Sequence, residues 1–345
     1  MRSEAAKMQM KTLLPLAIGL AATAWLFYDD FNPDNFSNFE WNWRMVAGFA
    51  LAWVFMFGRD FGLSWRFHTI ARPGLTWKRA FRVNYMCAFT SAVTPSAVGG
   101  SAFAILYLNR EGVKLGRATT MTLTTLFLDE MFFVVFCPII MLAFPVDELF
   151  ASGVDTGFMD GIELVFWLVY AGICVWALIL FFGIIVKPHT VARTLKRIVC
   201  WRYLKRWRRS TFETADNMVA ASQELRGCSR RWWLNVFGAT TLSWFSRYLV
   251  VNALFWGFVP EASQTLIFAR QFVVWVVLMV SPTPGGSGIS EWLFTNYYGD
   301  LIASASVALI LALTWRIVSY YIYLVIGTVL IPFYFSKRKN NDKQT

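Results

Sequence analysis

The stretch SPTPGGSGISEW at residues 281–292 directly follows an apolar run at 272–280 and decides how the rest of the chain is interpreted. Its two prolines and three glycines break a helix and let the backbone turn back on itself. The carboxylate of Glu291 follows in the returning segment. Irregular backbone inside hydrocarbon is tolerated only where it is buried in protein or lines a wet cavity. The stretch therefore predicts one wall of a binding site within a membrane-embedded fold.

Composition supports a membrane location for most of the chain. Of the 345 residues, 57% are hydrophobic and only 15% are charged, compared with roughly 25% charged in soluble domains. Apolar stretches long enough to cross about 30 Å of hydrocarbon lie near residues 12–28, 43–62, 118–144, 162–186, 232–259 and 303–335. The first continues past a signal-like ATA stretch at 22–24, so we interpret it as a retained helix. A single all-α polytopic membrane domain, 1–345, with six full transmembrane helices is predicted.

The formal net charge of +11 is distributed unevenly. Basic residues gather before residue 12 and in 59–82, 107–117, 187–231 and 337–345, whereas the intervening segments are acidic. This pattern is typical of the positive-inside rule, and it predicts an inner (plasma) membrane protein with cytoplasmic N- and C-termini. No compact basic domain remains for nucleic acid. The five cysteines form no CxxC pair, so no metal site or cofactor is predicted.

Two apolar segments cannot cross the membrane without breaking this topology. Segment 83–106 has basic residues on both sides and contains TPSAVGGS at 94–101, while segment 264–298 contains TPGGS at 283–287. We interpret both as re-entrant helical hairpins, which makes eight membrane segments, in an inverted repeat with halves 43–144 and 232–335. An ordinary span with a Pro/Gly kink is the alternative. The predicted lining residues at the breaks are Pro95, Gly99, Gly100, Pro284, Gly285, Gly286 and Ser287.

Seven ionisable residues lie within or close to the predicted spans, and five of them are the candidates for substrate binding: Asp129, Glu130, Arg247, Glu291 and Arg316. A buried charge costs at least about 2.5 kcal/mol on insertion scales, so each needs a partner, water or a ligand. We assign Arg247 and Arg316 to an anionic group, because guanidinium forks match phosphate oxygens. The carboxylates would balance these charges or hold an amine or a proton. Structural ion pairing is the alternative, and the sequence leaves open whether Arg270 also lines the site.

Two other interpretations concern catalysis and the basic loop. Gly285–Gly288 matches the GxSG pattern of rhomboid proteases, but His68 and His189 both lie in predicted loops, so the serine has no base. The loop 187–231 is predicted to form two short interfacial helices on the cytoplasmic side. They would bind anionic lipid or serve only to set the topology.

Residues 284–291 (PGGSGISE) resemble the P-G-G-x-G-x-x-E signature of the lysylphosphatidylglycerol synthase transmembrane family. REGVKLGRA at 110–118, the acidic pair Asp129 and Glu130, and Arg316 are also similar to features of that family. The resemblance implies an eight-segment fold with inverted hairpins and a role in moving lipids between leaflets. The first hairpin departs from the family pattern because it carries no Arg or Glu after its proline. About ten residues follow the last span, so we expect no aminoacyltransferase domain and no synthesis of lysyl-lipid by this chain.

The sequence thus predicts a flippase-like or scramblase-like transporter that moves an anionic phospholipid or a polyprenyl phosphate. A membrane-embedded glycosyltransferase or other transferase acting on polyprenyl-phosphate lipids is the competing class, since the same arginines would hold its phosphate. A non-catalytic partner of a separate lipid-modifying synthase is a third interpretation. The oligomeric state is not predicted.

Overall fold

The structure is a computed structural model that describes residues 42–71, 73–94, 99–150, 156–199, 208–283, 285–302 and 304–336. Every regular element in these ranges is helical, which confirms the all-α prediction. The predicted first span, 12–28, and Pro95 and Pro284 lie outside the described residues. The α-helices are α3 (Trp43–Ile70), α4 (Trp77–Val93), α5 (Gly99–Arg110), α6 (Leu115–Ala143), α7 (Val146–Leu149), α8 (Thr156–Phe181), α9 (Pro188–Val199), α10 (Arg208–Arg226), α11 (Arg230–Phe258), α12 (Gln264–Leu278), α13 (Ile289–Tyr297), α14 (Ala305–Arg316) and α15 (Ile322–Ser336).

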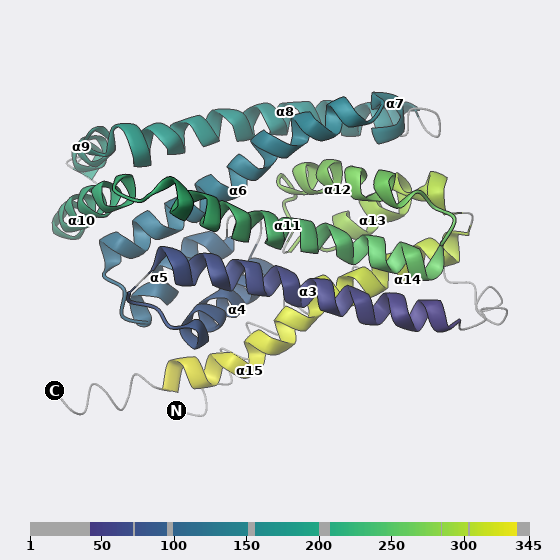
Figure 1. Cartoon of the computed structure of the whole chain (residues 1–345), viewed down its shortest axis with the longest axis horizontal. Coiled ribbons are helices and arrows are strands. Elements are labelled where there is room, and N and C mark those ends of the chain that lie inside the picture. The colour runs from purple at the N-terminus through teal and green to yellow at the C-terminus, as the bar shows by residue number, and fades with distance from the viewer. Residues whose placement is uncertain are drawn as a thin grey trace.

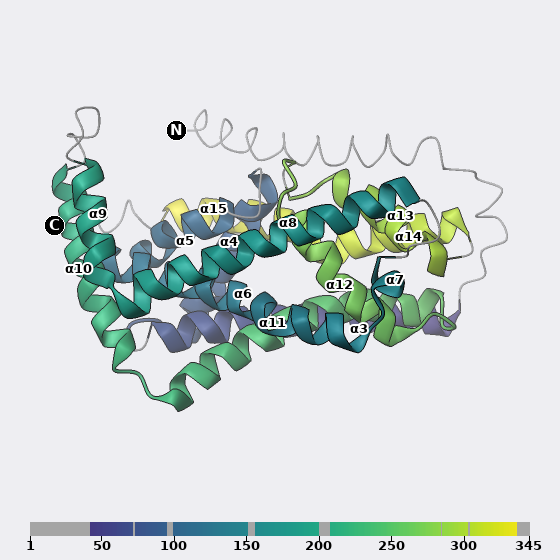
Figure 2. The same cartoon turned by 90° about the horizontal axis from the view of Figure 1, so that it is seen from above.

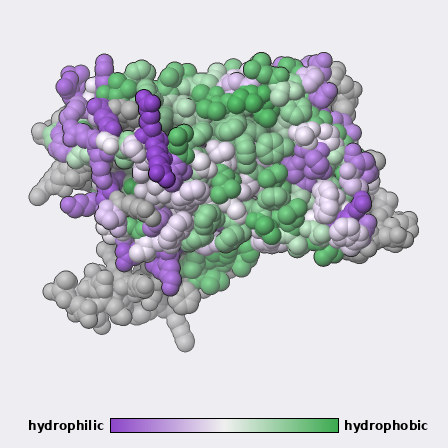
Figure 3. All heavy atoms as spheres, viewed as in Figure 1, coloured by the Kyte–Doolittle hydropathy of each residue, from purple (hydrophilic) through white to green (hydrophobic). Residues whose placement is uncertain are grey.

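Four described helical stretches are long and apolar enough to cross a membrane: Trp43–Ile70, Leu115–Ala143, Met159–Phe181 and Ser306–Leu330. They coincide with the spans predicted at 43–62, 118–144, 162–186 and 303–335. Helix α11 covers the prediction at 232–259 and has 29 residues, but it is not among these four. The surface shows an apolar band between two polar ends (Figure 3).

Helix α3 runs eight residues beyond the predicted end of its span, to Ile70. The prediction ended at residue 62, within the segment 59–82 that was assigned to the basic cytoplasmic side. In the structure Arg59, Asp60 and Arg66 are all buried within the helix. Carboxylates neutralise both arginines, as described below, so their charges do not end the helix.

Helices α3 and α11 pack side by side along their length and run antiparallel (Figure 1). Two glycines of α3 allow this close approach. A Cβ atom added at Gly48 would lie 2.6 Å from the carbonyl oxygen of Ala253, and one at Gly62 would lie 2.7 Å from that of Ala239. Small residues at helix interfaces are the usual means of close packing in membranes. The α3–α11 pair therefore forms a tightly packed centre of the bundle.

Substitution Gly48→Ala is expected to destabilise the protein by about 1–3 kcal/mol, because the new methyl group would force the two backbones apart. Gly172→Ala on α8 is the matched control, since a Cβ there meets nothing within 4 Å. Thermal unfolding of the purified variants in detergent, followed by circular dichroism, measures both. Equal unfolding temperatures for the two variants would contradict the packing described here.

The two helix pairs that flank the Pro/Gly stretches lie at opposite ends of the bundle. Helices α4 and α5 lie at the end that carries α9 and α10, and α12 and α13 lie at the other end, beside α7 (Figure 1). The succession of a long helix, two short helices and a long helical stretch occurs twice, as α3–α6 and as α11–α15. Helices α9 and α10 stand crosswise to the long helices (Figure 2).

Candidate functional site

The break between α12 and α13 depends on glycines in the left-handed region. Gly285, Gly286 and Gly288 have φ angles of 57°, 73° and 83°, which residues with a Cβ rarely adopt. Gly285 is further constrained because a Cβ there would lie 2.1 Å from a ring carbon of Tyr320. Any larger residue at position 285 would therefore displace the break from this ring.

A buried ion pair holds this break in place. Glu291 and Arg316 are 2% and 5% exposed, and the Nε of Arg316 donates to Oε1 of Glu291 at 2.9 Å. The other oxygen of Glu291 accepts hydrogen bonds from the Gly288 amide and the Ser290 hydroxyl, both at 2.8 Å. Arg316 Nη2 also donates to the Gly285 carbonyl at 3.1 Å and the Ser287 hydroxyl at 3.2 Å. The pair thus satisfies backbone and hydroxyl groups of the PGGSGISE stretch.

Tyr320 connects the two broken segments. Its ring lies against the Arg316 guanidinium, with 4.0 Å between the guanidinium carbon and the ring centroid. Its hydroxyl donates at 3.1 Å to the carbonyl of Ala92, near the end of α4. Tyr320 belongs to a π-helical turn, Ile317–Tyr321, that directly follows Arg316. Such turns within α-helices often occur at functional sites. The ends of the two broken segments therefore meet at Tyr320.

In the first broken segment, Gly100 is the predicted lining residue with a clear structural role. A Cβ at Gly100 would lie 1.8 Å from the Ser91 hydroxyl and 2.6 Å from the Cys87 carbonyl. Helix α5 therefore packs directly against the backbone of α4 at this point. Gly99 is the first residue of α5.

Asp129 lies in a second buried network that joins α3, α6 and α11. Arg66 binds its carboxylate bidentately, at 2.6 and 3.0 Å. The indole nitrogen of Trp244 donates to the same carboxylate at 2.9 Å. Arg66 also donates to the hydroxyl of Thr240 at 3.3 Å. This geometry fixes the Trp244 ring relative to α6.

A third pair lies nearby on α3 and was not among the predicted site residues. Arg59 Nη1 donates to Asp60 at 2.7 Å, and the hydroxyl of Tyr323 donates to the same carboxylate at 2.8 Å. The Arg59 guanidinium lies 4.8 Å from the centroid of the Tyr323 ring. Arg59 was counted with the basic segment 59–82, although the predicted span 43–62 already contains it.

Arg247 is partly buried and differs from the buried arginines in its partners. Its guanidinium carbon lies 4.7 Å from the ring centroid of Trp244 and 4.5 Å from that of Trp275. Within the described ranges, no carboxylate lies at ion-pair distance from it. Its electrostatic neighbours include Arg59, Tyr323 and Asp129. A guanidinium that stacks on indole rings and has no carboxylate partner among the described residues is a suitable binding point for an anion.

Two further charges have contrasting surroundings. Arg270 is bound bidentately by Asp300 at 2.6 and 2.7 Å and also donates to the Glu148 carbonyl, so it joins α12 to the segments around it. Glu130 has a buried Oε2 atom for which the described residues provide no hydrogen-bond partner. Arg270 is thus fully engaged, whereas Glu130 is not.

Seven of the predicted site residues fall into two groups, whereas Glu130, Gly99 and Gly100 belong to neither. Gly285, Gly286, Ser287, Glu291 and Arg316 form the first, while Asp129 and Arg247 meet at Trp244 in the second. Tyr320 of the first group and Tyr323 beside the second lie three residues apart on one segment. No cluster of His, Cys, Asp or Glu suited to a metal ion occurs in the described part of the chain.

Comparisons with known proteins place the chain among membrane proteins. The family model described as "Lysylphosphatidylglycerol synthase TM region" matches residues 12–327. A "UPF0104 membrane protein" from Archaeoglobus fulgidus is 20% identical over 346 aligned positions, which cover 95% of this chain and 98% of the relative. No solved structure matches the chain.

Proposed function

The chain belongs to the lysylphosphatidylglycerol synthase transmembrane-region family of membrane proteins, and from this premise we propose that it moves an anionic lipid between the two leaflets. The substrate would be a phospholipid or a polyprenyl phosphate. The two broken segments would line the path of the headgroup. Transporters of comparable design place their substrate site where broken helices meet near the midplane.

The observation that carries this proposal is the position of Arg247. A guanidinium without a carboxylate partner is costly inside a membrane protein, unless water or a ligand compensates its charge. The phosphate of a passing lipid would supply that compensation through two parallel hydrogen bonds.

The remaining predicted residues would support this step. Arg316 and Glu291 would hold the second break in its irregular conformation beside the path. Asp129 orients Trp244, against which Arg247 packs. Glu130 is the carboxylate best suited to carry a proton, because one of its oxygens is buried without a partner among the described residues.

The proposed topology follows from the same arrangement. The α4–α5 and α12–α13 pairs would be re-entrant hairpins that enter from opposite faces, within an inverted repeat of 43–144 and 232–335. Their location at opposite ends of the bundle supports this. The end that carries α9 and α10 would face the cytoplasm, with both chain termini on that side of the inner membrane. Helices α9 and α10 would lie in the interface because they stand crosswise to the bundle.

The experiment that tests this function measures lipid movement in proteoliposomes. Purified protein is reconstituted with fluorescent analogues of phosphatidylglycerol, phosphatidylcholine, diacylglycerol and a polyprenyl phosphate, and dithionite reports the label in the outer leaflet. We expect accelerated movement of at least one phosphate-bearing anionic lipid relative to protein-free vesicles, and no acceleration for diacylglycerol. Absence of movement for every lipid would overturn the proposal. Mass spectrometry of the same vesicles then separates an enzyme, which forms a new product, from the partner of a separate synthase, which does not.

A further inference from the structure

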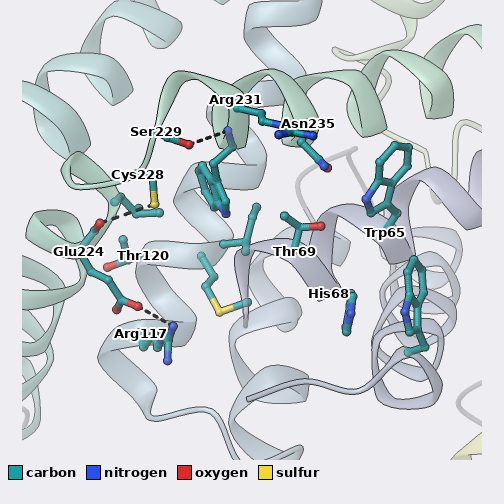
Figure 4. A pocket seen from close by; sticks show the side chains of 15 residues that line it. Trp65, His68, Thr69, Arg117, Thr120, Glu224, Cys228, Ser229, Arg231 and Asn235 are labelled. Atoms are coloured by element: carbon teal, nitrogen blue, oxygen red, sulfur yellow. Dashed lines mark hydrogen bonds and ion pairs between the residues drawn. The ribbon is translucent and has the colours of Figure 1, made fainter. Parts of the chain in front are cut away.

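A cavity of about 430 Å³ lies at the end of the bundle that carries α10. Arg247 is not among the residues that line it. It is bounded by the end of α3, the starts of α4, α6 and α11, and the end of α10 (Figure 4). Its size falls within the range of about 300–1,000 Å³ typical of small-molecule sites. Basic residues surround this end of the described chain: Lys78, Arg79, Arg110, Lys114, Arg117, Arg226, Arg230 and Arg231. The cavity is therefore a candidate for a ligand with negative charge.

The lining combines aromatic and charged side chains. Trp65, Trp77 and Trp232 contribute indole rings, and Arg117, Glu224 and Arg231 contribute charges. Tryptophan and arginine together at a polar boundary are typical of the headgroup region of a membrane. A lipid headgroup combines the polar and apolar chemistry that such a lining recognises.

The charges favour an anion over a cation. Arg117 is paired with Glu224 at 2.8 Å, which cancels both charges and links α6 to α10. Arg231 is exposed, and in the described ranges it has no carboxylate at ion-pair distance. The formal charges of the lining therefore leave one positive charge, on Arg231. Asn235, one turn further along α11, adds an amide donor beside it.

The alternative of an aromatic cage for an ammonium group fits poorly. Cation–π binding requires an open ring face. The ring of His68 stacks on Trp77 with 4.5 Å between the ring centroids, and the ring of Phe61 stacks on Trp77 with 5.6 Å between the centroids. Glu224, the carboxylate that would assist a cation, is engaged by Arg117.

The surface next to the cavity can accommodate acyl chains. Leu234 precedes Asn235 on α11 and is 71% exposed, and Leu115 at the start of α6 is also exposed. A headgroup in the cavity would leave its acyl chains against such apolar side chains, which are otherwise covered by lipid tails. Free inorganic phosphate would use Arg231 but gain nothing from this surface.

We propose that this cavity binds the phosphate-bearing headgroup of a membrane lipid through Arg231 and Asn235, at a site separate from Arg247. Such a site would concentrate lipid at the basic end of the bundle. Binding there does not require transport. A failure of lipid translocation therefore leaves this inference intact, and a failure of binding leaves the proposed function intact.

Cys228 lines the cavity and provides a probe of its occupancy. The full-length protein in detergent is treated with N-ethylmaleimide, and modification of Cys228 is followed by peptide mass spectrometry. Dioctanoyl phosphatidylglycerol should slow this modification at saturating concentration, because a headgroup in the cavity would cover the Cys228 thiol. Dioctanoylglycerol, inorganic phosphate and tetramethylammonium at the same concentration should not.

The substitution Arg231→Gln should weaken the apparent affinity for phosphatidylglycerol about tenfold, the loss expected for one charge-assisted hydrogen bond. Arg230→Gln is the matched control, because Arg230 is also exposed in the first turn of α11 but does not line the cavity. Lipid retention in native mass spectra of both variants gives a readout that is independent of thiol chemistry.

Equal retention of phosphatidylglycerol by the two variants would overturn the proposal. Equal protection of Cys228 by inorganic phosphate would identify free phosphate as the ligand and exclude the lipid. Protection by dioctanoylglycerol would indicate that a lipid without a phosphate fills the cavity through apolar contacts alone. Protection by tetramethylammonium would indicate that the cavity binds a cation. Either result would also overturn the assignment.

Discussion

Replacing Arg316 with glutamine should destabilise the folded protein by about 3–5 kcal/mol, the usual penalty when one member of a buried ion pair is removed. The substitution leaves the Glu291 carboxylate, which is 2% exposed, without its only cationic partner in the described part of the chain. It also removes the donors to the Gly285 carbonyl and the Ser287 hydroxyl. Thermal unfolding in detergent measures the loss.

The double substitution Glu291→Gln with Arg316→Gln is the informative companion. Because it removes both charges, it should recover a large part of the stability lost in Arg316→Gln, as neutral replacements of buried pairs often do. The two single variants and the double variant together form a mutant cycle that isolates the pairwise free energy. An additive cycle would show that the pair does not hold the break.

Replacing Asp129 with asparagine should also cost about 3–5 kcal/mol, because Arg66 is buried and would lose its bidentate carboxylate. The change should also weaken the hydrogen bond from the Trp244 indole nitrogen to residue 129 and so leave the Trp244 ring less firmly held. Thermal unfolding reports the first effect. A shift of tryptophan fluorescence that disappears in a Trp244→Phe background reports the second.

Glu130→Gln is the matched control for Asp129→Asn, since it alters the neighbouring carboxylate on the same helix. The buried Oε2 of Glu130 has no hydrogen-bond partner among the described residues. Neutralising it should therefore leave the free energy of unfolding unchanged or raise it slightly. If Glu130→Gln proved as destabilising as Asp129→Asn, the assignment of the two carboxylates to different roles would be wrong.

Local sequence patterns predicted the helical class and the position of the broken segments. Apolar runs marked the long helices α3, α6 and α8 well, because helix length and hydropathy are properties of a continuous stretch. The PGGSGISE stretch predicted an interruption, and the structure places three positive-φ glycines there. Both features depend only on residues that lie close together in the sequence.

Pairing between distant residues could not be predicted in the same way. Arg66 and Asp129 are 63 positions apart, and Arg270 and Asp300 are 30 apart. The distribution of charge along the chain assigned Arg59 and Arg66 to the basic cytoplasmic segment 59–82, because basic residues gather there. Only the packing of α3 against α6 and α11 brings Asp129 and Thr240 to Arg66. Single-sequence patterns contain no signal for that contact.

The central claim is that Arg247 holds the lipid phosphate during its passage, and Arg247→Gln tests it most directly. Because Arg247 has no carboxylate partner among the described residues, the variant should unfold at the same temperature as the wild type or higher. Its rate of lipid translocation in proteoliposomes should fall about tenfold or more, the loss expected for one charge-assisted hydrogen bond. Arg44→Gln, at an exposed position in the first turn of α3, should translocate lipid at the wild-type rate. A folded Arg247→Gln protein that moves lipid as fast as the wild type would contradict the account.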